Sequence, residues 1–173
     1  GQLYDYTQGQ SDIEQGRVRF IGQARQRIRE DYLRILRLFR FHAAYGRGPI
    51  DPEAMQSVIA EQAGLSRLSR ERIRMELLKL LSLDGCLKVI PAMAGTGILS
   101  RLIGGVPHLA RFERLMAQSL NLKEKPATES QPALLRLAGL NVDISEDADR
   151  LLDRLRLSRA EHARLVNAAD VRS

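Results

Sequence analysis

The most constraining feature of the sequence is the segment EDYLRILRLFRFHA at residues 30–43, because its apolar residues repeat at a helical period. The repeat follows the i, i+3, i+4, i+7 pattern of a core-facing helix stripe, and its members are Tyr32, Ile35, Leu36, Phe39 and Ala43. Other apolar side chains lie outside that stripe: Leu33, Leu38 and Phe41. A helix that is apolar on most sides is usually surrounded by protein or ligand. We therefore expect its charged residues to emerge into a crevice.

Asp31 and Arg34 are the charged pair in this segment with the most specific chemistry. Their i, i+3 spacing places them on adjoining ridges of one helix. The carboxylate only accepts hydrogen bonds and the guanidinium only donates them. Adenine and cytosine present an amine donor beside a ring-nitrogen acceptor, and guanine and uracil present the reverse. A rigid Asp/Arg couple would therefore accept A or C, because G or U would leave buried polar groups unpaired.

The alternative for this pair is an ordinary intrahelical ion pair, which contributes about 0.2–0.5 kcal/mol to a helix. Such pairs are common, and the spacing alone does not distinguish the two interpretations.

Further motifs surround this pair at defined spacings. They are LYDY at residues 3–6, GQSDI at 9–13, GRVRFIG at 16–22, RIREDYLRILR at 27–37, and SRERI at 69–73 followed by ELLKLL at 76–81. In this order they resemble class II nucleotidyltransferases, the family of the CCA-adding enzymes and bacterial poly(A) polymerases. The resemblance is detailed over residues 3–81 and diffuse beyond them.

The resemblance implies a role for individual residues. Asp31 and Arg34 match the family motif whose aspartate and arginine act as an amino-acid template for the base of ATP or CTP. Asp12, Gly16 and Arg19 match a flexible element that joins the catalytic head to the neck. Glu71 and Arg72 match a motif that braces the template helix. The residues expected to support or position the template helix are Asp12, Arg19, Glu30, Arg37, Glu71 and Arg72.

The resemblance also implies a catalytic head, with a metal-binding carboxylate pair on a β-sheet and an Arg-Arg-Asp motif, before residue 1. These motifs do not occur in the 173 residues. We therefore expect the head to hold the Mg²⁺ ions, and this chain alone to incorporate no nucleotide. The whole enzyme would extend an RNA 3′ end by in-line attack of the terminal hydroxyl on the α-phosphate of a nucleotide. Both CCA addition and poly(A) addition remain open.

The charge balance is basic, with 27 Lys and Arg against 21 Asp and Glu and a formal net charge of +6. Such a balance favours polyanions such as RNA, and the family resemblance points to the 3′ end of tRNA. The excess of Arg over Lys suits bidentate phosphate contacts, and equally suits a GC-rich genome. A different class of function also fits, a stand-alone basic helical RNA-binding or scaffold module without catalysis.

The sequence also constrains disulfide formation, metal binding and membrane insertion. Cys86 is the only cysteine, which excludes an internal disulfide and fits a reducing compartment. The three histidines are far apart in sequence and have no metal-ligand spacing. No apolar run approaches the ~20 residues that span a bilayer. We therefore expect a soluble, cytoplasmic protein with Cys86 buried and no metal site of its own.

The predicted fold is an all-α, multi-helix array preceded by a short extended segment that belongs to a missing sheet. Residues 3–6 and 18–21 are β-prone and flank a turn, as an edge cut from a larger sheet would be. A helical turn from residue 23 leads into the template helix, which should end at residues 46–49. Further helices should begin after the caps Asp51, Ser69, Ser145 and Ser158 and near Thr128, with two more helices in 83–105 broken at 95–97 and one over 107–122.

The sequence predicts three domains. Residues 1–22 form the link to the missing head, residues 23–82 form a neck with the base-recognition helix, and residues 83–173 form a helical, RNA-binding body.

Overall fold

The computed structural model describes residues 5–121 and 130–170, which form eleven α-helices and two 3-10 helices without any strand. The helices are α1 (Gly9–Gln15), α2 (Ala24–Glu30), α3 (Leu33–Tyr45), α4 (Pro52–Glu61), α5 (Arg70–Ser82), α6 (Ile90–Gly95), α7 (Ile98–Ile103), α8 (Leu109–Asn121), α9 (Ser130–Asn141), α10 (Ser145–Leu155) and α11 (Arg159–Asp170). The 3-10 helices are η1 (Gln62–Arg67) and η2 (Asp84–Lys88). The all-α prediction is confirmed for the described residues.

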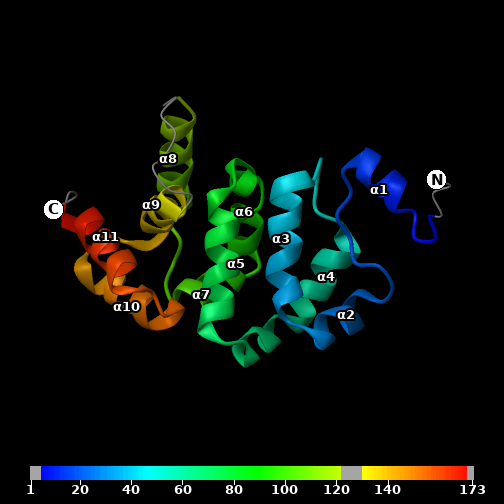
Figure 1. Cartoon of the computed structure of the whole chain (residues 1–173), viewed down its shortest axis with the longest axis horizontal. Coiled ribbons are helices and arrows are strands. Elements are labelled where there is room, and N and C mark those ends of the chain that lie inside the picture. Colours follow the sequence, from blue (N-terminus) through cyan, green and yellow to red (C-terminus); the bar gives the residue numbers. More distant parts are fainter. Residues whose placement is uncertain (1–4, 122–129, 171–173) are drawn as a thin grey trace.

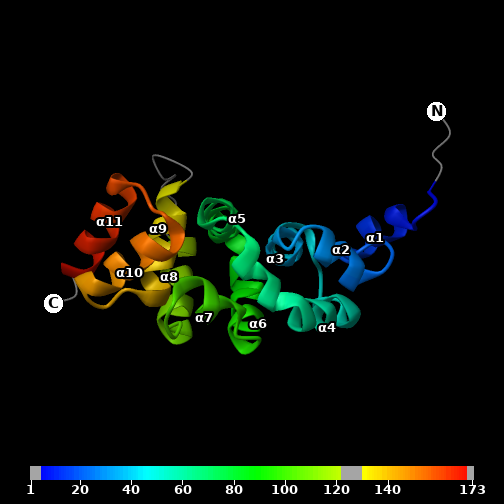
Figure 2. The same cartoon turned by 90° about the horizontal axis from the view of Figure 1, so that it is seen from below.

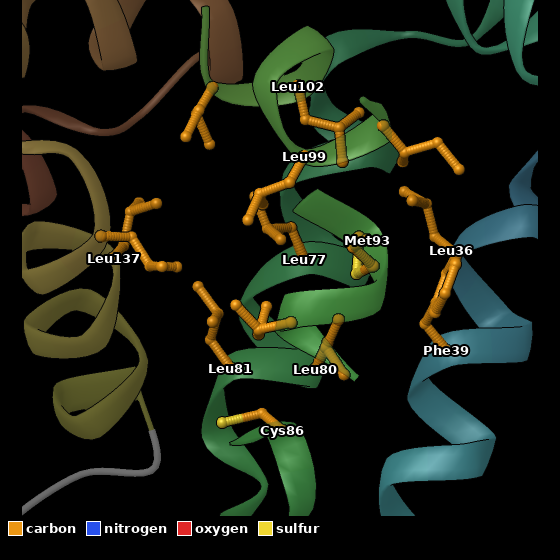
Figure 3. Packing of buried hydrophobic residues seen from close by; sticks show 14 of the residues in the cluster. Leu36, Phe39, Leu77, Leu80, Leu81, Cys86, Met93, Leu99, Leu102 and Leu137 are labelled. Carbon is orange, nitrogen blue, oxygen red and sulfur yellow. The ribbon is translucent and has the colours of Figure 1, made fainter. Parts of the chain in front are cut away.

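The helices lie side by side in an elongated row (Figures 1 and 2). Helix α5 stands near the middle, between α3 on one side and α9 on the other (Figure 3). Figure 3 shows Leu36 and Phe39 of α3 on the side of the core where Met93 of α6 and Leu80 of α5 lie, while Leu137 of α9 approaches from the opposite side. One continuous apolar core therefore connects the helices from α2 to α11.

Local sequence signals fix several of the helix starts. The carboxylate of Asp51 accepts a hydrogen bond from the Ala54 backbone N–H at 2.9 Å, directly before Pro52. The Ser69 hydroxyl accepts from the Arg72 N–H at 3.3 Å. Ser158 and Glu161 form the predicted reciprocal capping box, with bonds of 2.6 and 3.2 Å. These caps are confirmed, as is the break between α6 and α7 at residues 96–97.

Other predicted boundaries are wrong in detail. The sequence predicts that Gly64 ends the helix after Asp51, but helix α4 ends at Glu61 and the chain continues as η1 past Gly64. Ser145 is the first helical residue, and the carboxylate of Asp147 instead accepts from the N–H groups of Asp143 and Ile144. The predicted cap at Thr128 lies outside the described residues.

The prediction for the N-terminal segment also needs correction. Residues 9–15, expected as a turn between two extended pieces, form helix α1. Residues 18–21 are irregular rather than a strand, and residues 3–4 lie outside the described part. A sheet edge is therefore absent from residues 5–22. The three predicted domains stay a prediction.

None of the helices within residues 5–121 and 130–170 combines the length and the apolarity that crossing a bilayer requires.

Candidate nucleotide-binding site at the start of helix α3

The predicted template helix is interrupted at Asp31. Helix α2 ends at Glu30, and Asp31 has an extended backbone (φ −154°, ψ 105°) before α3 begins at Leu33. One Asp31 carboxylate oxygen, Oδ1, accepts a hydrogen bond from the Leu33 N–H at 3.1 Å. An aspartate side chain can satisfy a free N–H at a helix start in this way. Asp31 and Arg34 therefore do not share one helix, and Asp31 instead helps to start α3.

A guanidinium from α5 holds the Asp31 carboxylate. Nη2 of Arg72 donates to Oδ1 at 3.0 Å and to Oδ2 at 3.1 Å. Arg72 lies in the first turn of α5, whose start the Ser69 cap fixes. This contact joins the N-terminal end of α5 to the junction between α2 and α3. The neighbouring Glu71 is exposed, and no side-chain hydrogen bond or ion pair joins it to another described residue.

A second carboxylate holds Arg34. Nη1 of Arg34 donates to the Glu30 carboxylate at 2.6 Å and to the backbone carbonyl of Arg27 at 2.7 Å. Arg27 also donates to Glu30, at 2.5 Å. The Arg34 backbone N–H donates to the Asp31 backbone carbonyl at 3.0 Å. Among the described residues no side-chain hydrogen bond or ion pair joins Arg34 to Asp31, so the simple ion pair between them does not form. The Nη2 and Nε groups of Arg34 have no hydrogen-bond acceptor within the described chain.

The site is open to a ligand while its geometry is constrained. The side chains of Asp31 and Arg34 are 24% and 27% exposed, so solvent reaches both. Behind them, Tyr32 packs against Gly64 so closely that a Cβ at Gly64 would lie 1.9 Å from the tyrosine Cε1. The guanidinium of Arg67 lies 5.5 Å from the centre of the Tyr32 ring. The arrangement thus holds an acceptor, the Asp31 carboxylate, and a donor, the Arg34 guanidinium, through separate partners, and both remain partly exposed.

Two other arginines of α3 lie close to a buried carboxylate of α5. Glu76 of α5 is almost fully buried, and it receives Nε of Arg40 at 2.7 Å and of Arg37 at 3.6 Å. The sequence reasoning named Arg37 but missed Glu76. The sequence does contain a signal for a buried, paired glutamate. Glu76 comes three residues after Ile73 and directly before Leu77, within the apolar stripe of α5. A charged group on a core-facing stripe requires a partner of opposite charge.

Glu61 is the second residue that the sequence reasoning missed. It lies on the buried stripe of α4 with Ala54 and Val58 and accepts from Arg29 at 2.8 and 2.9 Å and from Arg25 at 2.9 Å. Hydrogen bonds from Arg29 and then Arg25 lower the pKa of the Glu61 carboxyl. These ion pairs hold α2 against α4, and they thereby fix the helix that leads into the site.

The N-terminal residues form a separate cluster. Nε of Arg19 donates to Asp12 at 2.7 Å, and its Nη2 donates to the carbonyl of Thr7 at 3.0 Å. The turn between them contains Gly16, whose φ of +63° favours glycine. Its carbonyl accepts from the Arg47 N–H at 2.9 Å, and a Cβ on Gly16 would lie 2.6 Å from Cγ of Arg47.

The described residues do not fit a magnesium site. Magnesium requires oxygen ligands grouped at one point, and residues 5–121 and 130–170 contain no cluster of three His, Cys, Asp or Glu side chains suited to a metal. Cys86 is buried as predicted, and its burial raises the pKa of the thiol to about 11.

Comparison with known proteins gives consistent matches. Residues 49–112 match the family model described as "Probable RNA and SrmB- binding site of polymerase A". The chain is 35% identical over 166 residues to mitochondrial CCA tRNA nucleotidyltransferase 1 of Mus musculus. The aligned region covers 93% of this chain and 36% of the mouse protein. The chain is 49% identical over 86 residues to the Homo sapiens protein of the same name, covering 47% and 19%, respectively.

A bacterial relative extends the comparison. The CCA-adding enzyme of Bacillus velezensis is 33% identical over 147 residues, which covers 81% of this chain and 35% of that protein. The chain thus spans about a third of the length of the mouse and Bacillus relatives.

Proposed function

Because this chain belongs to the class II family of CCA-adding enzymes and poly(A) polymerases, we propose that it supplies base selection and RNA binding to an enzyme that extends RNA 3′ ends. ATP and CTP are the proposed nucleotide substrates, and the 3′ end of tRNA is the proposed RNA. The relatives named above are CCA-adding enzymes, which favours CCA addition over polyadenylation.

The observation that carries the proposal is that other side chains hold both the Asp31 carboxylate and the Arg34 guanidinium while both groups stay partly exposed. The bond from Leu33 N–H and the bonds from Arg72 fix the direction of the carboxylate. Glu30 fixes Arg34 through Nη1 and leaves Nη2 and Nε to donate. Pre-positioned polar groups discriminate between ligands better than mobile ones, because a mismatched ligand leaves them unpaired.

In the proposed mechanism the Asp31 carboxylate accepts a hydrogen bond from the exocyclic amine of A or C. Arg34 donates to the ring nitrogen beside that amine. Arg72 remains on the carboxylate as a positioning residue, since one carboxylate oxygen can accept more than one hydrogen bond. Guanine or uracil would bring a carbonyl against Asp31 and an N–H against Arg34, which repel.

The bond-forming chemistry is assigned to a catalytic domain outside these residues. Residues 5–121 and 130–170 contain no cluster of three side chains suited to a metal, and we assign to them the binding and orientation of substrates. We propose that the isolated chain incorporates no nucleotide into RNA.

The test is a ratio of incorporation rates in the complete enzyme. Asp31→Ala and Arg34→Ala should lower the preference for ATP and CTP over GTP and UTP, by about 1–3 kcal/mol of discrimination in analogy with direct base readout. A change that only unfolds the helix lowers all four rates alike. Unaltered preference in properly folded variants would contradict the template role.

RNA binding has its own measurement. We expect weak binding of tRNA-like RNA that falls as salt rises, because Lys and Arg release counterions from the phosphates. Absence of binding even at low salt would favour the alternative, a helical scaffold used only for protein contacts.

A further inference from the structure

An exposed stripe of four side chains runs along α3, from the proposed base site to the end of the helix. Its members, spaced i, i+3, i+7 and i+11, are Arg34, Arg37, Phe41 and Tyr45. Residues at these spacings share one helix face. The rise of 1.5 Å per residue gives the stripe a length of about 16 Å. Leu36 and Phe39 lie outside this stripe, on the face of α3 that contributes to the core (Figure 3).

The far end of this stripe is a preformed stack of planar groups. The rings of Phe41 and Tyr45 lie 6.4 Å apart at an interplanar angle of 26°. The guanidinium of Arg40 lies 4.4 Å from the centre of the Phe41 ring, and its bond to Glu76 at 2.7 Å holds it there. Tyr45 is 70% exposed and Phe41 40% exposed. Tyr45 is thus the outer, accessible member of an ordered stack.

The charge around the stack favours a polyanion as its occupant. Helix α3 contains three arginines and no aspartate or glutamate. Arg37 is 42% exposed and lies 3.6 Å from Glu76, beyond hydrogen-bond distance, so its guanidinium can still bind an anion. Single-stranded nucleic acids are bound by aromatic side chains that stack on bases beside cationic groups that follow the phosphates. A protein partner would instead favour a broad apolar patch. The rings of Phe41 and Tyr45, with Arg40 against Phe41, form only a narrow apolar surface.

We propose that the Arg37–Phe41–Tyr45 face of α3 binds single-stranded RNA, with one unpaired base stacked on Tyr45 and a phosphate near Arg37. This inference rests on the proposed function, because it extends the nucleotide site at Arg34 along the same helix face. A stacked strand advances about 3.4 Å per nucleotide, so Tyr45 would receive a base about five nucleotides from the incoming one. The 3′ strand would then lie along α3, with its end toward α2.

The experiment measures binding of a labelled oligoadenylate of about ten nucleotides, within the usual footprint of such sites, to the purified chain at low salt. Tyr45→Ala should weaken binding about five- to 150-fold, the range for loss of one stacked base. Tyr45→Trp should retain binding, and its fluorescence should be quenched by the RNA. The chain contains no other tryptophan, so that signal reports this position alone.

Two controls separate stacking from general effects. Tyr6→Ala removes an exposed tyrosine from outside α3 and should leave the affinity unchanged. A blunt RNA duplex, which offers no unpaired base, should bind Tyr45→Ala and wild type equally.

The outcomes separate this inference from the proposed function. If the oligoadenylate binds wild type and Tyr45→Ala alike, or if the tryptophan is not quenched, the stacking site is wrong while RNA binding stands. If neither RNA binds any variant at low salt, the proposed RNA binding fails and this inference fails with it. Equal weakening by Tyr6→Ala and Tyr45→Ala would also overturn the site.

Discussion

Helix α3 is joined to α5 by arginine–carboxylate pairs at two places, and the two places differ in burial and in direction. At the start of α3 the carboxylate of Asp31 belongs to the α2–α3 junction and the arginine, Arg72, belongs to α5. In the middle of α3 the arginines belong to α3 and the carboxylate, Glu76, belongs to α5. The side chain of Asp31 is 24% exposed and that of Glu76 is 7% exposed.

The difference in burial indicates that the pairs at Glu76 stabilise the fold, whereas the pair at Asp31 can also contact a ligand. A buried carboxylate that loses its arginines is left without solvation, so its pairs are tied to the fold. A partly exposed pair contributes little to stability, and its groups remain within reach of a ligand. Changes at the buried pair should therefore lower the free energy of unfolding more than changes at the partly exposed pair.

Glu76→Ala should lower the free energy of unfolding by about 2–3 kcal/mol, because it removes buried hydrogen bonds to charged groups and leaves a void between α3 and α5. Urea denaturation followed by circular dichroism measures this change. Glu113→Ala on the exposed side of α8 is the matched control and should shift stability by no more than about 0.5 kcal/mol. A Glu76 variant as stable as that control would contradict the structural role of the buried pair.

Gly64→Ala should destabilise the junction by about 1–2 kcal/mol, because the added methyl group collides with the ring of Tyr32. It alters no charge in the site. Ala63→Gly, one residue earlier on an exposed position, is a control that changes the same helix without a collision. If Gly64→Ala melts at the wild-type temperature, the Tyr32 contact does not hold the junction in place.

Glu61→Gln should remove part of the acid sensitivity of the fold. The pKa of Glu61 is lowered in the folded state by Arg29 and Arg25, so its contribution is complete above the unfolded-state pKa of about 4.3. That contribution is lost as the pH falls through the lower, folded-state pKa. Thermal melts between about pH 3 and pH 6 should show a shallower decline for the variant than for wild type. Parallel declines would show that Glu61 does not contribute to acid unfolding.

Asp31→Asn and Arg72→Ala should change stability least, each by less than about 1 kcal/mol, because the pair is partly exposed. Asparagine can still accept from the Leu33 N–H and cap α3. Urea denaturation of both variants measures the change. If either variant lost as much stability as Glu76→Ala, the two places would not differ, and any loss of base preference could be attributed to unfolding.

The fold was predictable where the determinants are local. The caps at Asp51, Ser69 and Ser158 are short-range hydrogen bonds, and residue type and spacing are enough to predict them. Helix α1 was not predictable in this way, since none of its residues is buried and its end is held by a bond from Arg47, which is distant in sequence.

The candidate site was predictable in its residues but not in its connections. The interruption at Asp31 leaves the apolar period from Tyr32 to Ala43 intact, so periodicity could not reveal it. The contact of Arg72 with Asp31 spans 41 positions in the chain and depends on how α5 packs against α3. Glu61 and Glu76 could have been flagged from their place on apolar stripes, but their arginine partners are set by the tertiary arrangement.

The attachment of α1 has a consequence for local unfolding. Helix α1 buries no side chain, and two hydrogen bonds from Arg47, to the carbonyls of Gly16 and Glu14, tie its end to the turn after α3. Opening such a segment exposes almost no apolar surface, so it requires far less free energy than global unfolding. Amide hydrogens of α1 should therefore exchange with solvent long before those of α3 and α5. Exchange of the α1 amides as a group, with α3 and α5 still protected, would identify the segment as a separate unit of local unfolding.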